Sequence, residues 1–261
     1  MARIGYGGRV SFDDLGHEVP RNSPVSRVVS LVPSLTESIA LTRPQALVAA
    51  TQWCTFPPEL DVPRIRGTKN PDCRAIAALA PDLVIANMEE NREIDVRRLR
   101  SAGLNVWVTR IESVEQALTS MSRMFTEALG WDVPDWLAQA GLVWAQPPTL
   151  QGVRTAAVIW RDPWMVVGSG TFAGDLLHRL GCINAFETSP QRYPTVDVGD
   201  LDGLGLDVIL LPDEPYRFTS ADGPEAFPRT PTALMDGRML TWYGPSLVAA
   251  RAHLEGCIQT R

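Results

Sequence analysis

Short apolar runs alternate with helix-forming stretches along this chain, and the alternation occurs in two separate blocks. Strands are predicted at 27–32, 46–50, 83–86 and 105–108 in the first block and at 155–159, 207–211 and 239–242 in the second. Helices are predicted between them at 34–41, 72–79, 94–102 and 172–180. Because strands that alternate with helices usually pair in parallel and are covered on both faces, the fold class is α/β, with two Rossmann-like lobes built on central parallel sheets.

Helical sequence also joins the two blocks. The stretch 113–130 carries apolar residues at helical spacing, and a second helix is expected from Asp132 to about Gln146, where Pro147 and Pro148 stop it. We therefore predict a rigid linking helix rather than a flexible linker. The expected domains are an N-terminal extension with a short hairpin at 1–26, a first lobe at 27–131, the linking helix at 132–148 and a second lobe at 149–261.

Two of the predicted strands run directly into loops that carry tryptophan. The strand at 46–50 is followed by Trp53 and Phe56, and the strand at 155–159 by Trp160, Arg161 and Trp164. Small ligands bind at the carboxyl ends of strands in α/β sheets, and an indole ring supplies a large, rigid apolar face. The pattern therefore predicts a cleft for a sizeable, flat, partly apolar molecule more than it predicts a catalytic site.

The charge balance and the cysteine spacing narrow the classes of partner. The 261 residues include 24 basic and 30 acidic side chains, with a net charge of −6 and no sustained stripe of Lys or Arg, which makes nucleic acid and anionic membrane poor partners. No apolar run reaches the roughly 18 residues of a membrane span, so no membrane insertion is expected.

Four widely spaced cysteines predict free thiols. Cys54 is either a small apolar filler or a thiolate that could ligate cobalt or iron.

The first residues bear on the location of the protein. The segment from Met1 to Phe12 has no apolar run long enough for a signal peptide, so we expect a cytoplasmic protein. A chain from which an export signal had been removed would look the same, and it would be periplasmic or otherwise extracytoplasmic.

Eight short motifs lie in an order typical of one known superfamily. They are RVVSLVPSLTE (27–37), WCTFPPE (53–59), GTKNPD (67–72), APDLVIA (80–86), IWRDPWMVVG (159–168), QRY (191–193), DVILLPDEPYRF (207–218) and TWYG (241–244). Together they resemble the class III, or helical-backbone, periplasmic substrate-binding proteins, the receptors for cobalamin and ferric siderophores, and the cobalamin-type branch most of all. The resemblance implies two lobes bridged by one long helix, with a ligand held in the cleft.

The resemblance and the strand-end positions together imply the ligand-binding residues. They are Pro33, Trp53, Phe56, Thr68, Lys69, Asn70, Glu90 and Asn91 in the first lobe, and Trp160, Arg161, Trp164, Tyr193, Glu214, Tyr216, Trp242 and Tyr243 in the second. The aromatic side chains would enclose the apolar face of the ligand. The polar side chains of Lys69, Asn91, Arg161, Glu214 and Tyr243 would fix its orientation. We predict no catalytic residue and no metal ligand.

The function that follows is the binding of a corrinoid (cobalamin-like) or related metal-organic compound, with no covalent cofactor. One alternative is a cytosolic enzyme that acts on a corrinoid or tetrapyrrole, with Glu90 and Glu214 as acid/base groups. Another is the ferric-siderophore-binding component of an ABC importer.

Docking to an ABC permease is doubtful on the sequence. Members of the superfamily dock through an acidic residue on each lobe, and by our alignment those positions fall at Arg74 and Gly199. Arg74 has the wrong sign, although Asp72, Asp197 and Asp200 lie close enough to substitute. Homodimer formation is left open.

Overall fold

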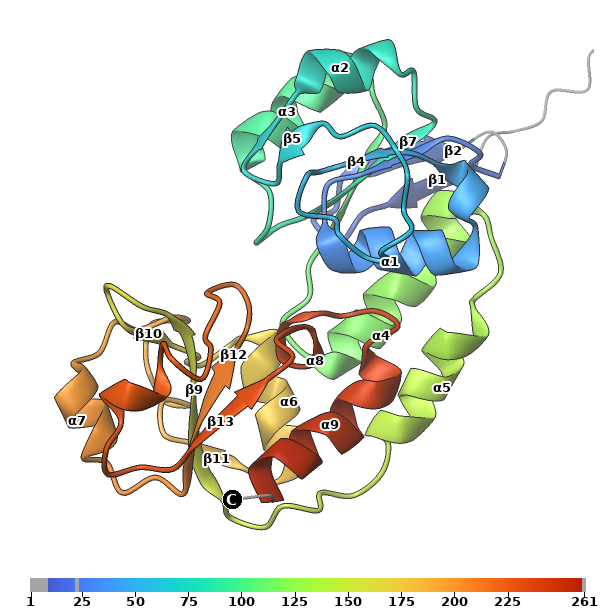
Figure 1. Ribbon diagram of the computed structural model, residues 1–261. Helices are drawn as coiled ribbons and strands as arrows, with labels where there is room; N and C mark the ends of the chain where they lie inside the picture. Colours follow the sequence, from blue (N-terminus) through green and yellow to red (C-terminus); the bar gives the residue numbers. More distant parts are fainter. Residues whose placement is uncertain (1–8, 22–23, 260–261) are drawn as a thin grey trace, which may run out of the picture. The chain divides into compact units, whose positions relative to one another are not determined.

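The computed structural model describes residues 9–21 and 24–259 (Figure 1). The chain divides into two compact units. Unit 1 contains the chain up to Ile111 together with Gln116–Ala138, and unit 2 contains Glu112–Glu115 together with Gln139–Arg261. The dividing points fall inside or beside two helices, α4 (Val114–Arg123) and α5 (Asp135–Trp144).

Unit 1 is built on a four-stranded parallel sheet. Its strands, in the spatial order β4-β3-β7-β8, are β4 (Leu47–Ala50), β3 (Val28–Ser30), β7 (Leu83–Asn87) and β8 (Val106–Thr109). Every residue of β3, β7 and β8 is buried, as expected for parallel strands that are covered on both faces. The carboxyl ends of the four strands lie at one edge of the sheet.

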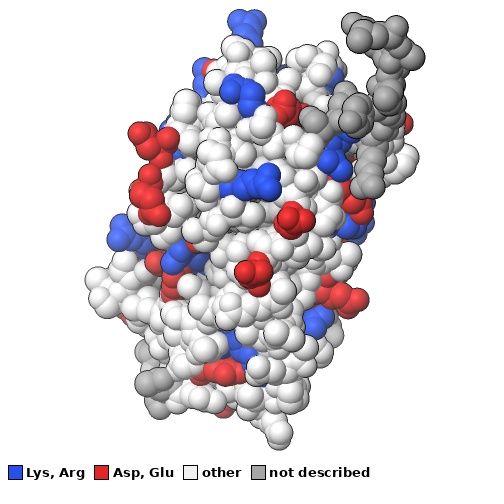
Figure 2. Space-filling model, turned by 90° about the vertical axis from the view of Figure 1, so that its right-hand side faces the viewer, with Lys and Arg blue, Asp and Glu red and all other residues white. Residues whose placement is uncertain are grey.

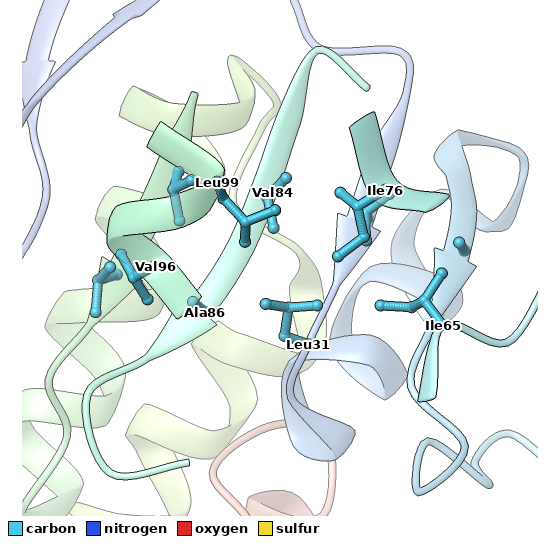
Figure 3. Close-up of a cluster of buried hydrophobic side chains, with 11 residues drawn as sticks. Leu31, Ile65, Ile76, Val84, Ala86, Val96 and Leu99 are labelled. Atoms are coloured by element: carbon cyan, nitrogen blue, oxygen red, sulfur yellow. The ribbon is translucent and has the colours of Figure 1, made fainter. Parts of the chain in front are cut away.

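Helices cover both faces of this sheet (Figure 1). On one face lie α2 (Cys73–Ala78) and α3 (Glu93–Ser101), whose Ile76, Val96 and Leu99 pack on Val84 and other strand residues, as Figure 3 shows. On the other face lie α1 (Pro33–Thr42) and a π-helical segment, η2 (Met124–Leu129), that continues α4. A short 3-10 helix, η1 (Pro44–Ala46), leads from α1 into β4.

Two small hairpins complete unit 1. The first pairs β1 (Arg9–Phe12) with β2 (Glu18–Arg21), and its turn is fixed by two ion pairs, Asp13 to Arg100 at 2.6 Å and Asp14 to Arg123 at 2.7 Å. The second pairs β5 (Arg66–Gly67) with β6 (Asn70–Pro71).

Unit 2 has a mixed sheet with a parallel centre. Its strands are β9 (Arg154–Trp160), β10 (Met165–Val166), β11 (Ile183–Asn184), β12 (Val208–Pro212) and β13 (Thr232–Met235). The spatial order is β10-β9-β12-β13, with β11 also paired to β9, and only β10 runs antiparallel to its neighbour. The helices of this unit are α6 (Phe172–Leu180), α7 (Val198–Asp202), η3 (Pro224–Ala226), α8 (Arg238–Thr241) and α9 (Leu247–Gln259).

The strand predicted at 239–242 is wrong. The chain forms helix α8 there, and the last strand is β13, which pairs in parallel with β12. Asp236 accepts a hydrogen bond from the backbone N–H of Arg238 (3.0 Å), and the N–H of Thr241 donates to the carbonyl of Gly237 (2.9 Å), so a helical turn forms. A short apolar run such as 239–242 fits a buried helical turn as well as a strand, because periodicity does not separate the two at this length.

The α/β fold class, with two lobes and parallel central sheets, is confirmed. The domain boundaries and the rigidity of the linking segment stay predictions. Within the described ranges, no helix is both long enough and apolar enough to cross a bilayer. On the face drawn in Figure 2, the described basic and acidic side chains are interspersed.

Candidate ligand-binding site

Trp53 is the most prominent side chain at the strand ends of unit 1. It follows β4 and is 60% exposed. The hairpin β5–β6 lies against its ring: a Cβ atom on Gly67 would be 3.1 Å from Trp53 Nε1 and 2.6 Å from Asn70 Oδ1. Glycine is therefore needed at position 67 for the indole and the amide to approach. Asn70 also accepts a hydrogen bond from the N–H of Gly67 (3.2 Å), which closes the turn.

Pro33 and Phe56 lie at two other strand-end positions of unit 1. Pro33 is the first residue of α1, three residues after the end of β3, and Phe56 is in the loop after β4; both are half-buried. Their neighbour Cys54 is fully buried, and its Sγ lies 3.0 Å from the hydroxyl of Thr36 and 3.1 Å from that of Thr51. Burial raises the pKa of the Cys54 thiol. Cys54 is therefore packed within unit 1, and within the described residues its thiol donates or accepts only at these two hydroxyl groups.

The loop after β7 brings an acidic pair to the same edge. The backbone N–H groups of Glu89 and Glu90 donate to Asn87 Oδ1 at 2.8 and 3.2 Å, and Lys69 Nζ donates to the carbonyl of Glu89. Burial raises the pKa of Glu90, and the positive charge of Lys69 partly opposes this rise. Lys69 is thus close enough to Glu90 to act on its charge, and the role of both residues in ligand binding stays a prediction.

Asn91 has a different position from the one expected of a ligand-orienting residue. Its side chain is buried, its Nδ2 donates to the carbonyls of Thr68 (2.9 Å) and Leu31 (3.4 Å), and its Oδ1 accepts from the N–H of Asn87 (2.9 Å). The amide therefore ties together three strand-end segments. Asn91 positions Thr68, which is half-buried in the β5–β6 turn.

Aromatic rings form one continuous network at the strand ends of unit 2. Trp160, the last residue of β9, meets Tyr216 edge-to-face with ring centroids 5.8 Å apart, and Tyr216 lies 4.7 Å from Phe218. Phe218 stacks on Trp164 at 6.0 Å, and Trp164 also meets Phe227 at 5.3 Å. Phe218 and Phe227 are buried in the unit 2 core, with Trp164 and Tyr216 packed against them. Trp160, 42% exposed, is the member that offers most of its surface to solvent.

Arg161 links the two loops that carry these rings. Its guanidinium lies 5.0 Å from the Trp164 ring, and its Nη1 pairs with Asp222 and, at 2.5 Å, with Glu225. The Tyr216 hydroxyl donates to the other oxygen of Asp222 at 2.7 Å. The hydrogen bond from Arg161 lowers the pKa of Glu225. Arg161 is therefore held by carboxylates of its own unit.

Glu214 follows β12 and lies beside Trp242. Burial raises the pKa of Glu214 to about 7, although hydrogen bonds from the side chains of Thr241 (3.1 Å) and Trp242 oppose the rise. Trp242 and Tyr243 are both only 7% exposed, and Tyr243 packs edge-to-face on Phe172 at 5.6 Å. They follow α8 rather than a strand, and much of their surface is used in packing within unit 2.

Arg192 contacts Glu112 and Gly170, two residues that line a cavity of unit 2. Arg192 Nη1 pairs with Glu112 at 2.6 Å and also donates to the carbonyl of Gly170, and its guanidinium lies 6.0 Å from the half-buried Tyr193 ring. The cavity, about 240 Å³, is lined by Glu112, Gly168, Ser169, Gly170, Thr171, Gly174, Asp175, His178, Cys182, Asn184 and Glu187. Thr171 caps α6 by accepting from the N–H of Gly174, so this glycine-rich loop opens a helix.

Sequence reasoning missed the carboxylates that hold the two arginines. Asp222 and Glu225 lie 61 and 64 positions from Arg161, and Glu112 lies 80 positions from Arg192. No local pattern marks such pairs, because only the folded chain brings them together. In the described ranges, no group of three or more His, Cys, Asp or Glu side chains is arranged to hold a metal ion.

The residues considered for permease docking have local structural roles. Asp72 caps α2 by accepting from the N–H of Ala75, and Asp197 caps α7 by accepting from the N–H groups of Gly199 and Asp200. Arg74, Gly199 and Asp200 are exposed.

Known proteins share this architecture. No protein-family model matches the chain. A vitamin B12-binding protein of Vibrio parahaemolyticus serotype O3:K6 (strain RIMD 2210633) is 23% identical over 187 residues, which are 68% of this chain and 67% of that protein. The crystal structure of the periplasmic vitamin B12 binding protein of Vibrio cholerae matches with a TM-score of 0.72 at 18% identity, over 91% of this chain and 98% of that one. This chain has the class III substrate-binding protein fold.

The family resemblance drawn from the eight motifs is thereby confirmed. A second solved structure with this fold is named for a different ligand: the apo form of a periplasmic heme-binding protein from Roseiflexus sp. RS-1 matches with a TM-score of 0.72 at 22% identity, over 90% of this chain and 99% of that one. A substrate-binding role is supported by these relatives. Which ligand the chain takes depends on its own residues.

Proposed function

We propose that this chain binds a corrinoid or a related metal-organic compound through strand-end residues. The support is that each unit has an exposed indole at a strand end: Trp53 lies three residues after β4, and Trp160 is the last residue of β9. Large aromatic side chains lose apolar contact with the protein when they are exposed in this way, and a flat macrocycle restores it. Relatives named for vitamin B12 binding favour a corrinoid over other flat ligands.

The neighbours of the two indoles support a binding role rather than accidental exposure. Trp53 is held against Gly67, and Trp160 is held against Tyr216. Side chains whose positions are already fixed lose less conformational entropy when a ligand binds. The polar groups beside them, including Lys69 and Glu90, would then choose the orientation of the ligand.

Titration with cobinamide and cobalamin tests the proposal. Binding is expected to quench tryptophan fluorescence, and Trp53→Ala and Trp160→Ala are each expected to weaken cobinamide binding by about 10-fold or more, since hot-spot aromatic residues contribute about 2 kcal/mol. Leu142→Ala is the matched control, because Leu142 is 74% exposed but lies within helix α5. The proposal is contradicted if neither corrinoid quenches the tryptophan fluorescence, or if all three variants lose the same affinity for cobinamide.

A second candidate is an enzyme that acts on a corrinoid or tetrapyrrole. The observation that favours it is that burial raises the pKa of both Glu90 and Glu214, one carboxyl group in each unit, as acid/base catalysis at neutral pH needs. Incubation of the protein with cobinamide, followed by mass analysis of the corrinoid, distinguishes the two functions. A binding protein returns the ligand unchanged, whereas an enzyme converts it and loses turnover in Glu214→Gln.

The location and the membrane partner of this chain stay predictions. The solved structures similar to this chain are of proteins named periplasmic.

A further inference from the structure

The loop that carries Trp53 leaves β4 and returns beside it. We call residues 51–62 the β4 loop. Its two ends are tied together by the backbone, because the N–H of Ala50 donates to the carbonyl of Pro63 (3.1 Å) and the N–H of Ile65 donates to the carbonyl of Ala50 (3.0 Å). The shape of a surface loop with closed ends then depends on the contacts made inside it.

One guanidinium, that of Arg64, supplies contacts at three points of the β4 loop. Its Nη1 donates to the carbonyls of Thr51 (3.3 Å) and Cys54 (2.6 Å), and its Nη2 donates to the carbonyl of Leu60 (2.9 Å). Thr51 and Cys54 lie on either side of Trp53 in the sequence. A guanidinium holds its N–H donors in a rigid planar fork, so a single side chain can fix several backbone carbonyls at once.

These three carbonyls belong to two separate turns of the loop. The N–H of Cys54 donates to the carbonyl of Thr51 (3.1 Å) in the first turn, and the N–H of Leu60 donates to the carbonyl of Pro57 (3.0 Å) in the second. The buried side chain of Cys54 anchors only the first turn. The hydrogen bonds of Arg64 connect the second turn to the first.

We propose that Arg64 is a positioning residue, which holds the β4 loop in the conformation that presents Trp53 to a ligand. The proposal rests on the proposed function and deepens it. Trp53 is 60% exposed, so its position depends strongly on the backbone that carries it. A side chain that is already fixed loses less conformational entropy when a ligand binds. Arg64 therefore raises affinity through the loop, without contact with the ligand.

Amide hydrogen exchange of the protein without ligand tests the structural half of the proposal. In Arg64→Ala, the N–H groups of Cys54 and Leu60 are expected to exchange about 10-fold faster or more, because the two turns are no longer joined. The amides of the fully buried strand β7 are expected to exchange at the wild-type rate, which shows that the variant is folded. Unchanged exchange in the β4 loop overturns the proposal.

Arg27→Ala is the matched control. Arg27 is also exposed and also donates to backbone carbonyls of unit 1, those of Leu79 (2.6 Å) and Ala80 (3.4 Å), but it lies at the amino ends of the strands. Its replacement removes the same charge. It is expected to change neither the exchange of the β4 loop nor the affinity for cobinamide by more than about 2-fold.

A double-mutant cycle with cobinamide separates positioning of Trp53 from direct attraction of the ligand by the Arg64 charge. Arg64→Ala is expected to weaken cobinamide binding by about 5-fold or more in the wild-type background. In the Trp53→Ala background the same change is expected to weaken binding by less than about 2-fold, since the residue that Arg64 positions is then missing.

An equal loss in the two backgrounds means that Arg64 acts independently of Trp53 and overturns the proposal, while the proposed function stands. Wild-type affinity in Arg64→Ala overturns it as well. Failure of the wild-type protein to bind cobinamide overturns the proposed function, and with it the effect of Arg64 on affinity. The exchange measurement uses no ligand, so it distinguishes that failure from the absence of the loop contacts themselves.

Discussion

Replacing Glu214 by glutamine tests whether a half-buried carboxyl group just after β12 destabilises the protein at high pH. The pKa of Glu214 is raised from its ordinary value of 4.5 to about 7, mainly by burial, with the negative charges of Asp213 and Asp236 adding to the effect. The unfolded chain therefore releases this proton near pH 4.5, while the folded protein keeps it until about pH 7. The free energy of unfolding falls as pH rises through this window, because the folded state then binds more protons than the unfolded state.

The size of the effect follows from the two pKa values. Each pH unit between them corresponds to about 1.4 kcal/mol, so the full difference is about 3 kcal/mol above the window. Glu214 is only half-buried, and water that reaches it reduces the effect, so we expect about 1 to 3 kcal/mol. Glutamine has the shape of the protonated side chain and can keep the hydrogen bond from Thr241, but it cannot ionise.

Urea unfolding followed by tryptophan fluorescence, at about pH 4.5 and about pH 8.5, measures the difference. Glu214→Gln is expected to match wild type within about 0.5 kcal/mol at the lower pH and to be more stable by about 1 to 3 kcal/mol at the higher pH. Glu18→Gln, an exposed carboxylate on β2, serves as the control and should follow wild type at both. The reasoning is refuted if Glu214→Gln is no more stable than wild type at high pH.

Three further predictions concern buried groups of unit 1. Ile76→Ala removes a fully buried side chain from the cluster in Figure 3 and should lower the free energy of unfolding by about 2 to 5 kcal/mol in urea, whereas the usual surface effect of under about 0.5 kcal/mol would contradict the packing. Cys54 should be alkylated by iodoacetamide only after unfolding, since its thiol is buried and its pKa is raised; peptide mass mapping that finds Cys54 modified before the half-buried Cys73 would refute its position. Asn91→Ala should cost about 1 to 3 kcal/mol and also weaken cobinamide binding through the loop at Thr68, and unchanged stability would show that its three backbone hydrogen bonds are not formed.

The elements that could be predicted from sequence are those whose ends are determined locally. Helix α6 covers 172–180, as predicted, because Thr171 caps its start and Gly181 ends it in the left-handed conformation with φ of 93°. Strands β7 and β12 were predicted within a residue or two, since each is a short, fully buried apolar run. The strand prediction at 239–242 was wrong because the apolar residues there fit a helix as well as a strand. The hydrogen bonds of the turn at Asp236 and Gly237 start a helix instead.

The exposure of two of the predicted aromatic residues could be foreseen from the sequence, whereas the burial of two others and the electrostatics of the loops could not. Trp53 and Trp160 could be found because they follow or end predicted strands, and both are exposed there. The burial of Trp242 and Tyr243 could not be found, because it depends on α8 and on packing against Phe172. The ion pairs of Arg161 could not be found either, since their partners lie more than 60 positions away.

Equilibrium dialysis of the purified protein against cobinamide tests the central claim most directly. Corrinoids absorb visible light, so the ligand retained by the protein can be counted without any label. The account predicts retention that saturates at one cobinamide per chain, with a dissociation constant in the micromolar range or below, about −8 kcal/mol. Equal cobinamide on both sides of the membrane at all concentrations would contradict it.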